Sequence, residues 1–596
     1  MNGQVEGDRP AADFYLIPPH RATADTVLTW PVFADAYSQS TLVGAHFVRT
    51  EPDNSEWDPH TDEVFEVTGW LRQVNEERLS ALVERFLQNV HTKNPVLDVE
   101  LLLRDANRVA SYGLDWRPAS CLVLLAAALG VISKPFNPNT TNEDEDSTDV
   151  NRLREAETYF VLACRRLGGL KHSIQCAQCF FFAGVFMMYT LRPLLAWQYF
   201  IQASNTFRLY MKTKYSLSFA GAQPSIEQIA RQSKCVRRQE EAMYWSCFKS
   251  ESEFRVELPL PQSELAYDHH LQMFPTPPSP AAGHNARDKI DIGEVSSGGV
   301  SDVPSTDNSH DSVCSVALSR LYTEEESWYY YLTEIALRRI GNRIINSFFH
   351  CEPRKWLNIQ HYLGLAREYD TQLAAWSAHL PEAMKHWETA SAIRQPDSLS
   401  AQGKGNAVSQ ELGWALANRL LEARSWLYQP FLYWLVHSPL VPRNSKTMHR
   451  PTCQRFVSDL TNSMTAEDAM ALYQFIISGI ECSYQILETR SLRHRHHGLW
   501  YDLRSSMCVS LVLMAIVKSG HTSWLPDGGQ KLWQAQNLDR VRGSPYLQGD
   551  GSRGRLGRVM AEYGYWAKEC PSLERQITVL KEVIDTSIAA AQNLES

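Results

Sequence analysis

Residues 237–261 read RRQEEAMYWSCFKSESEFRVELPLP and have the pattern of a single amphipathic helix. Ala242, Trp245 and Phe248 recur at helical spacing, which predicts an apolar face packed on a core. Pro259 and Pro261 cannot continue a helix, so we expect the helix to end before them. The charged side chains of this segment are expected to stay in solvent: Arg237, Arg238, Glu240, Glu241, Lys249 and Glu251. The segment predicts a packed helix and shows no catalytic motif.

Apolar residues recur at helical spacing through most of the chain, without strand alternation or a fixed-period repeat. Helical patterns run approximately over residues 64–94, 97–112, 119–133, 173–189, 194–212, 324–349, 357–380, 412–435, 465–487, 500–519 and 556–594, and a further helix is expected from about Arg152 through Ala163. Hydrophobic residues make up 44% of the 596 residues, and 17 of them are Trp, which is enough for a large core. We therefore predict an all-α fold, a large irregular multi-helix domain with disordered acidic and Pro/Ser/Gly-rich insertions.

The insertions divide the chain into parts. The polar stretch in 135–149, NPNTTNEDEDSTD, cannot offset its ordering entropy and predicts a mobile acidic loop. Four parts are expected: an N-terminal linker or strap (1–60), the first half of a helical domain (61–275), a disordered linker (276–320) and the second half (321–596). Within the first part, the aromatic island around Trp30 and Phe33 is expected to pack on the main body.

Charge and cysteine content exclude several classes of protein. The net charge is -9, which argues against binding the nucleic-acid phosphate backbone unaided. The 12 cysteines are scattered through apolar helical stretches, as in buried thiols of an intracellular protein. The longest apolar runs, 121–133 and 507–517, are shorter than the roughly 20 residues that cross a bilayer. We expect no secretion signal, no membrane span and no membrane partner.

Three stretches resemble one known family. The segment 237–261, followed by Tyr267 and FPTPP at 274–278, resembles the signature of the regulatory domain of fungal transcription factors of the binuclear zinc-cluster type. RSWLYQPFL at 424–432 and the Gly498–Trp500 turn are similar to later parts of the same domain. The resemblance implies a nuclear regulator of RNA polymerase II target genes, general or pathway-specific, whose all-α body acts through small-molecule effectors, the transcription machinery or another family member.

The sequence departs from this family in one respect. The six-cysteine zinc cluster that normally precedes the domain occurs nowhere in it, so zinc and DNA binding are implied by the resemblance alone and we expect no cofactor in this chain. DNA would be reached through a missing N-terminal module or a partner. The alternative is a co-regulator without its own DNA-binding module, and a more remote one is an all-α enzyme. Because phosphate-loop, dinucleotide, GxSxG and HExxH motifs are absent, we predict no enzymatic activity.

Two motifs have a functional and a structural interpretation. Cys176 and Cys179 form a CxxC, but FFFAGVFMM follows at once, so a buried helix is expected rather than a zinc or redox site. The run RSLRHRHHG (490–498) contains His494, His496 and His497 and is interpreted as a solvated basic helix end rather than a metal or nucleic-acid site.

The aromatic run around Pro430 is the one candidate effector pocket. Pro430 removes a backbone hydrogen bond and is expected to bend its helix, bringing the neighbouring rings toward a shared cluster. Such a cluster either lines a pocket for a small molecule or is ordinary core. The candidate pocket residues are Trp426, Tyr428, Phe431, Tyr433 and Trp434.

Overall fold

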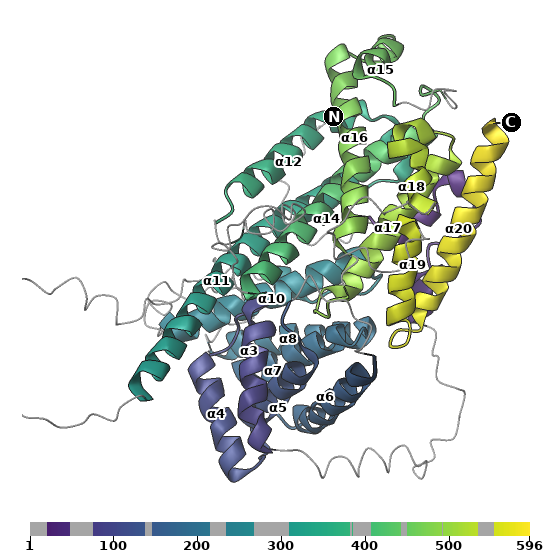
Figure 1. Cartoon of the computed structure of the whole chain (residues 1–596). Helices are drawn as coiled ribbons and strands as arrows, with labels where there is room; N and C mark the ends of the chain where they lie inside the picture. Colours follow the sequence, from purple (N-terminus) through teal and green to yellow (C-terminus); the bar gives the residue numbers. More distant parts are fainter. Residues whose placement is uncertain are drawn as a thin grey trace, which may run out of the picture.

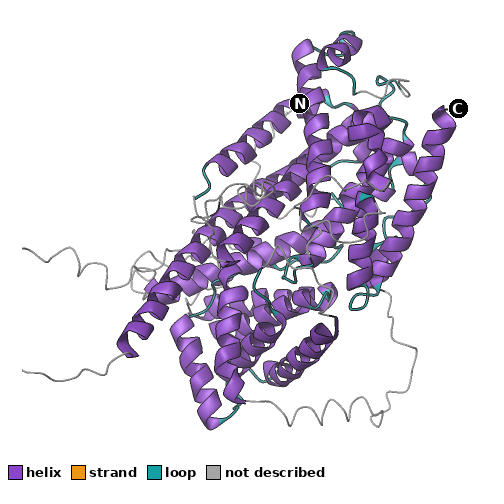
Figure 2. Cartoon of the chain, viewed as in Figure 1, coloured by secondary structure: helices purple, strands orange, loops and turns teal. Residues whose placement is uncertain are grey.

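The structure is a computed structural model that describes residues 21–47, 76–136, 146–214, 234–267, 309–381, 384, 407–442, 450–490, 493–533 and 554–595. Over these residues 79% are helical and none is in a strand, which confirms the all-α fold (Figure 2). Most of the predicted acidic loop and of the predicted 276–320 linker lies outside the described residues.

The helices follow the predicted positions closely. Their bounds in the first half are α1 (Ala24–Leu28), α3 (Leu79–Asn89), α4 (Val99–Tyr112), α5 (Pro118–Ile132), α6 (Asp146–Leu167), α7 (Ile174–Tyr189), α8 (Pro193–Lys214) and α10 (Lys234–Glu257). The second half contains α11 (Ser309–Phe348), α12 (Gln360–Ala378), α14 (Ala407–His437), α15 (Cys453–Leu460), α16 (Ala466–Thr489), α17 (Leu499–Lys518), α18 (Gln530–Trp533), α19 (Arg555–Trp566) and α20 (Ser572–Glu595).

Some boundaries differ from the prediction. Helix α11 begins at Ser309, so the last part of the predicted linker is helical, and α6 begins at Asp146, inside the predicted acidic loop. The predicted helical stretch 556–594 is broken between α19 and α20, where Pro571 precedes Ser572. The short helix α15 was not predicted, since its eight residues give too little periodicity.

The helices form two groups that meet at α10. Helices α3 to α8 form one group, and the long helices α11, α14, α16 and α17 with α20 form the other (Figure 1). Helix α10 contacts α7 and α8 in the first group and α11 in the second. One continuous core of buried apolar side chains extends from Ala22 to Ile584.

Apolar helices occupy the middle of each group. Helices α5 and α7 are apolar on all sides and buried along nearly their whole length, as a core helix must be. Gly130 of α5 lies so close to α3 that a Cβ there would be 2.0 Å from the Leu82 carbonyl oxygen. Among the described helices, only α17 is long and apolar enough to cross a membrane. However, 94% of its most apolar 18-residue stretch is buried inside the protein.

The N-terminal strap packs on the second half, as predicted. Trp30 and Phe33 are buried, and the Trp30 ring meets the Tyr433 ring edge-on with 5.1 Å between centroids. The Val32 amide donates to the Nε2 atom of His437 at 3.3 Å. The residues that follow the island are held by Asp25, whose Oδ1 accepts hydrogen bonds from the amides of Leu42 and Val43 at 2.8 and 3.0 Å.

Six charged side chains of α10 were predicted to lie in solvent, and this prediction is wrong for four of them. Glu240, Glu241, Lys249 and Glu251 are buried, whereas Arg237 is half-buried. The reason is that neighbouring elements cover α10 on more than its apolar face. Glu251, for example, accepts hydrogen bonds from the amide and the hydroxyl of Ser263 at 2.9 and 2.6 Å.

Candidate functional site

A cluster of six charged side chains lies where α10, α11 and α14 meet. We call it the central charge cluster, and its members are Lys249, Glu253, Glu334, Arg338, Arg419 and Glu422. The side chains are only 3% to 11% exposed. Lys249 pairs with Glu334 of α11. Charges this deep in a protein are stable only when they are paired, because desolvation costs several kcal/mol per ion.

Glu253 of α10 is shared between two cations. Its Oε1 atom accepts a hydrogen bond from Arg338 of α11 at 2.6 Å and also pairs with Arg419 of α14. Arg419 in turn pairs with Glu422, one turn further along α14, at 3.0 Å. With three cations and three carboxylates the cluster is formally neutral, and each of the three helices contributes one cation and one carboxylate.

The electrostatics of the central charge cluster depend on this balance. Burial alone would raise the pKa of Glu334, but Lys249, Arg419 and Arg338 together hold it below its ordinary value. The cavity beside the cluster has a volume of about 10 Å³, no larger than one water molecule. The cluster therefore holds helices together and has no room for a substrate or effector.

A second buried group ties the strap to α10 and α17. Arg504 of α17 is 0% exposed and donates to Asp25 at 2.7 Å and to Glu257 at 2.9 Å. Burial alone would lower the pKa of Arg504, but these two carboxylates raise it above its ordinary value. The guanidinium therefore stays charged. These three residues come from three segments that are far apart in the sequence.

The RSLRHRHHG run is largely buried, so the prediction of a solvated helix end is wrong. Arg490 caps the C-terminus of α16, and residues 493–498, all buried or half-buried except Arg493, form a turn that leads into α17. Arg490 lies 3.2 Å from Asp502, and the same carboxylate lies 3.3 Å from His496. Burial lowers the pKa of His496, a shift that Asp502 partly offsets. The run is thus held by ion pairs within the core, which helical periodicity could not indicate.

His494 belongs to a separate buried group of polar side chains. Its Nε2 atom lies 2.9 Å from Glu411 of α14, which also pairs with Lys93 at 2.5 Å. Burial alone would raise the pKa of Glu411, but Lys93 and His494 lower it to about 2. Within the described residues no group of three His, Cys, Asp or Glu side chains is arranged to hold a metal ion.

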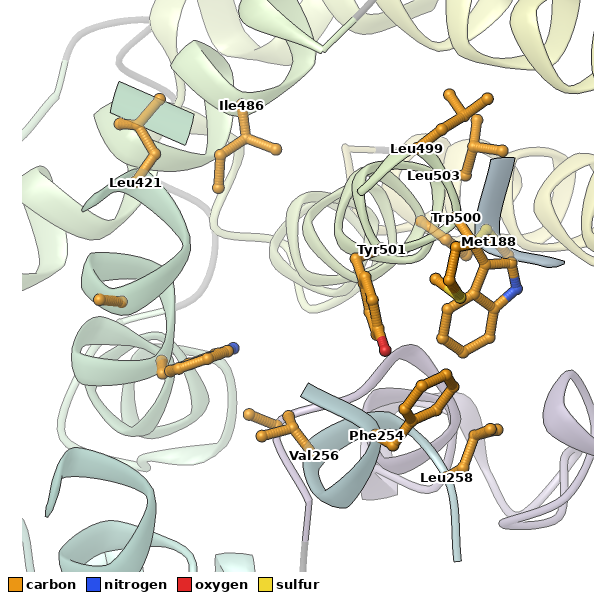
Figure 3. Packing of buried hydrophobic residues seen from close by; sticks show 14 of the residues in the cluster. Met188, Phe254, Val256, Leu258, Leu421, Ile486, Leu499, Trp500, Tyr501 and Leu503 are labelled. Atoms are coloured by element: carbon orange, nitrogen blue, oxygen red, sulfur yellow. The ribbon is translucent and has the colours of Figure 1, made fainter. Parts of the chain in front are cut away.

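Aromatic contacts join the same segments. Phe254 of α10 packs against the start of α17, with ring centroids 6.4 Å from Trp500 and 5.7 Å from Tyr501 (Figure 3). The guanidinium of Arg419 lies 5.8 Å from the centroid of the Tyr501 ring. A Cβ at Gly498 would lie 3.5 Å from the same guanidinium, so α14 passes close to the turn before α17.

The predicted aromatics on α14 are all buried but do not form one shared cluster. Pro430 lies inside α14, which continues through it. Tyr428 and Phe431 face Phe475 of α16, with centroid distances of 6.1 and 4.7 Å. Tyr433 instead packs on Trp30 and Trp356, and Trp434 packs on Phe456. Trp426 borders the water-sized cavity. That these five residues form an effector site remains a prediction.

The CxxC lies on a buried helix, as predicted. Cys176 and Cys179 are both in α7, and Ser173 caps this helix by accepting a hydrogen bond from the Cys176 amide at 3.1 Å. Burial raises the pKa of the Cys176 thiol to about 11. Thiols with raised pKa values are poor nucleophiles and poor metal ligands near neutral pH.

A larger pocket lies between α12 and α14. Its volume is about 430 Å³, and Trp376, Leu380, Leu416, Leu420 and Arg424 are among the residues that line it. None of the five predicted aromatics lines this pocket. The residues of α14 that line this pocket precede the predicted aromatics in the sequence. Helical periodicity gave no sign of this pocket, because small residues that leave space give no periodic signal.

Sequence reasoning also missed the central charge cluster, although a signal was present. In KSESEFRVE (249–257) charged residues occupy alternate positions, which on a helix project to nearly opposite sides. A helix that buries Trp245, Phe248 and Phe254 cannot direct all these charges to solvent, so some had to find buried partners.

Comparison with known proteins gives no assignment: no family model, no curated protein and no solved structure matches this chain.

Proposed function

We propose that this chain is the all-α regulatory body of a nuclear transcription regulator of the fungal zinc-cluster type, which controls RNA polymerase II target genes. The proposal starts from the resemblance of segments 237–278, 422–437 and 493–500 to that regulatory domain. DNA is reached through a separate module or a partner, since a net charge of -9 does not favour binding to phosphates.

The observation that supports the proposal is that the three resembling segments meet in space. Glu253 and Phe254 come from the first, Glu422 from the second and Trp500 from the third. Arg419 connects them, because it pairs with Glu253 and Glu422 and lies near Gly498. Segments that carry one signature and pack around one buried cluster act as a single unit, as a regulatory body requires.

The test is a reporter experiment with the full chain. Fused to a heterologous DNA-binding module in a fungal reporter strain, the chain is expected to enter the nucleus and to change transcription from the module's target promoter. The unfused chain serves as the control and is expected to leave that promoter unchanged. A fusion that occupies the promoter without any change in transcript level would contradict the proposal.

A matched pair of variants connects the reporter output to the structure. Glu253→Gln removes a carboxylate that two arginines share, whereas Glu481→Gln changes an exposed carboxylate on α16. We expect the first to alter reporter output at equal protein level and the second to leave it unchanged. A co-regulator would be recognised by output that depends on co-expression of an intact zinc-cluster factor.

A further inference from the structure

We propose that the 430 Å³ pocket between α12 and α14 binds an amphipathic monocarboxylate, whose carboxylate pairs with Arg424 and whose apolar body lies against Trp376, Leu416 and Leu420. Binding of this ligand is a property of the pocket alone and does not depend on the proposed role in transcription.

The pocket exists because small residues face each other across two helices. On α14, Gly413 and Ala417 fall on one stripe at helical spacing, and α12 contributes Ala374 and Ala378. Side chains this short cannot fill the space between two helices, although both helices pack on α11. A volume of about 430 Å³ lies in the range of about 300–1,000 Å³ typical of small-molecule sites.

The walls of the pocket are mainly apolar. Leu416 and Leu420 are buried on the α14 side, and Met384 and Leu380 lie at the α12 side. Trp376 is held in place because its Nε1 donates to the Thr333 carbonyl oxygen of α11 at 3.0 Å. Its ring therefore forms a fixed wall, and the pocket favours a ligand with an apolar body.

Among the described residues that line the pocket, only Arg424 is charged. Its Nε atom is buried without a hydrogen-bond partner, and among the described residues no carboxylate lies within ion-pair distance of it. Asp370 of α12 is already engaged, since its Oδ1 accepts the hydroxyl hydrogen bond of Tyr428 at 2.5 Å. A guanidinium beside apolar walls is complementary to a planar carboxylate, which accepts two parallel hydrogen bonds.

The experiment is calorimetric titration of the purified full chain with decanoate, decanol and decyltrimethylammonium below their micelle concentrations. The wild-type chain is expected to bind decanoate saturably at one site and to bind the uncharged and cationic analogues at least tenfold more weakly. Arg424→Gln should weaken decanoate binding by about tenfold to hundredfold, the loss of a charge-assisted hydrogen bond. Its affinity for decanol should be unchanged.

Two further variants separate charge from shape. Ala417→Leu places three extra carbon atoms in the pocket and should abolish decanoate binding, whereas Arg165→Gln changes an exposed arginine on α6 and should have no effect. Circular dichroism checks that each variant is folded. If Ala417→Leu does not fold, the comparison of Arg424→Gln with the wild type alone tests the proposal. The proposal is overturned if the wild type shows no saturable decanoate site, or if Arg424→Gln binds decanoate as tightly as the wild type.

Discussion

Glu411 shows how a buried carboxylate is kept ionised in this protein. It is buried on α14 between Lys93 and His494, and its pKa is lowered from 4.5 to about 2. A depressed carboxylate pKa contributes stability above the unfolded-state pKa, and that stability is lost as the pH falls through the folded-state value. The relevant window therefore lies between about pH 4.5 and 2.

We expect Glu411→Gln to lower the free energy of unfolding by about 3 kcal/mol at pH 7, because the pKa of Glu411 falls from 4.5 in the unfolded chain to about 2 in the folded one. The difference in unfolding free energy between the two proteins should narrow as the pH falls below about 4.5, because the unfolded wild-type chain then binds a proton at Glu411 that the folded chain binds only near pH 2. Urea denaturation between pH 7 and 3 measures both effects. Glu481→Gln on α16 is the exposed control, and a deficit that does not change with pH would contradict the explanation.

At the residue scale, the sequence indicated which side chains are charged but not which are buried. Glu240 and Lys249 were expected in solvent because α10 already has an apolar face in Trp245 and Phe248. Whether a charge is exposed depends on what covers the rest of the helix, and that is set by distant segments such as α8 and α11.

At the scale of elements, close packing between helices depends on a few glycines. Gly130 lets α5 approach α3 so closely that a Cβ would overlap the Leu82 carbonyl oxygen, and Gly184 of α7 would place a Cβ 2.8 Å from the Phe200 ring of α8. The first contact is the more restrictive, because backbone atoms cannot turn aside as a side chain can.

Gly130→Ala should destabilise the protein by about 1–3 kcal/mol or more, since α5 and α3 must move apart to admit the methyl group. Gly364→Ala on α12 is the matched control: nothing lies within 4 Å of its Cβ position, and a gain of about 0.5–1 kcal/mol is expected from the helix propensity of alanine. Thermal denaturation of the two variants compares them directly, and equal melting temperatures would refute the packing argument.

Helix positions were the most predictable feature at this scale. The periodicity of 119–133, 173–189 and 500–519 gives α5, α7 and α17 to within about one residue at each end. Boundaries failed where the local pattern is weak, as at Ser309 in α11. The pocket between α12 and α14 could not be predicted, because a gap between helices depends on how both pack on a third.

At the scale of the whole molecule, Asp25 joins the N-terminal strap to α17 and, through Arg504, to α10. It accepts two backbone hydrogen bonds within the strap and pairs with Arg504, which also pairs with Glu257 of α10. Loss of Asp25 leaves a buried guanidinium with one carboxylate in place of two, and it leaves two amides without their acceptor.

We expect Asp25→Ala to reduce the free energy of unfolding by about 3–5 kcal/mol. Hydrogen exchange should accelerate in α10 and α17 together, since both meet at Arg504. Asp459→Ala on α15, where the side chain is exposed, serves as the control for a simple loss of charge. If exchange increased only within residues 21–47, the strap would be an independent element and the prediction would fail.

Local sequence pattern was sufficient to establish an all-α protein, the order of its helices and the packing of the aromatic island around Trp30, because helical periodicity and prolines act over a few residues. Many of the buried charges are paired between segments that are far apart in the sequence, 85 residues for Arg338 with Glu253 and 479 residues for Arg504 with Asp25. The free energy of a buried ion depends on the partner that meets it, and that partner is known only once the helices have packed.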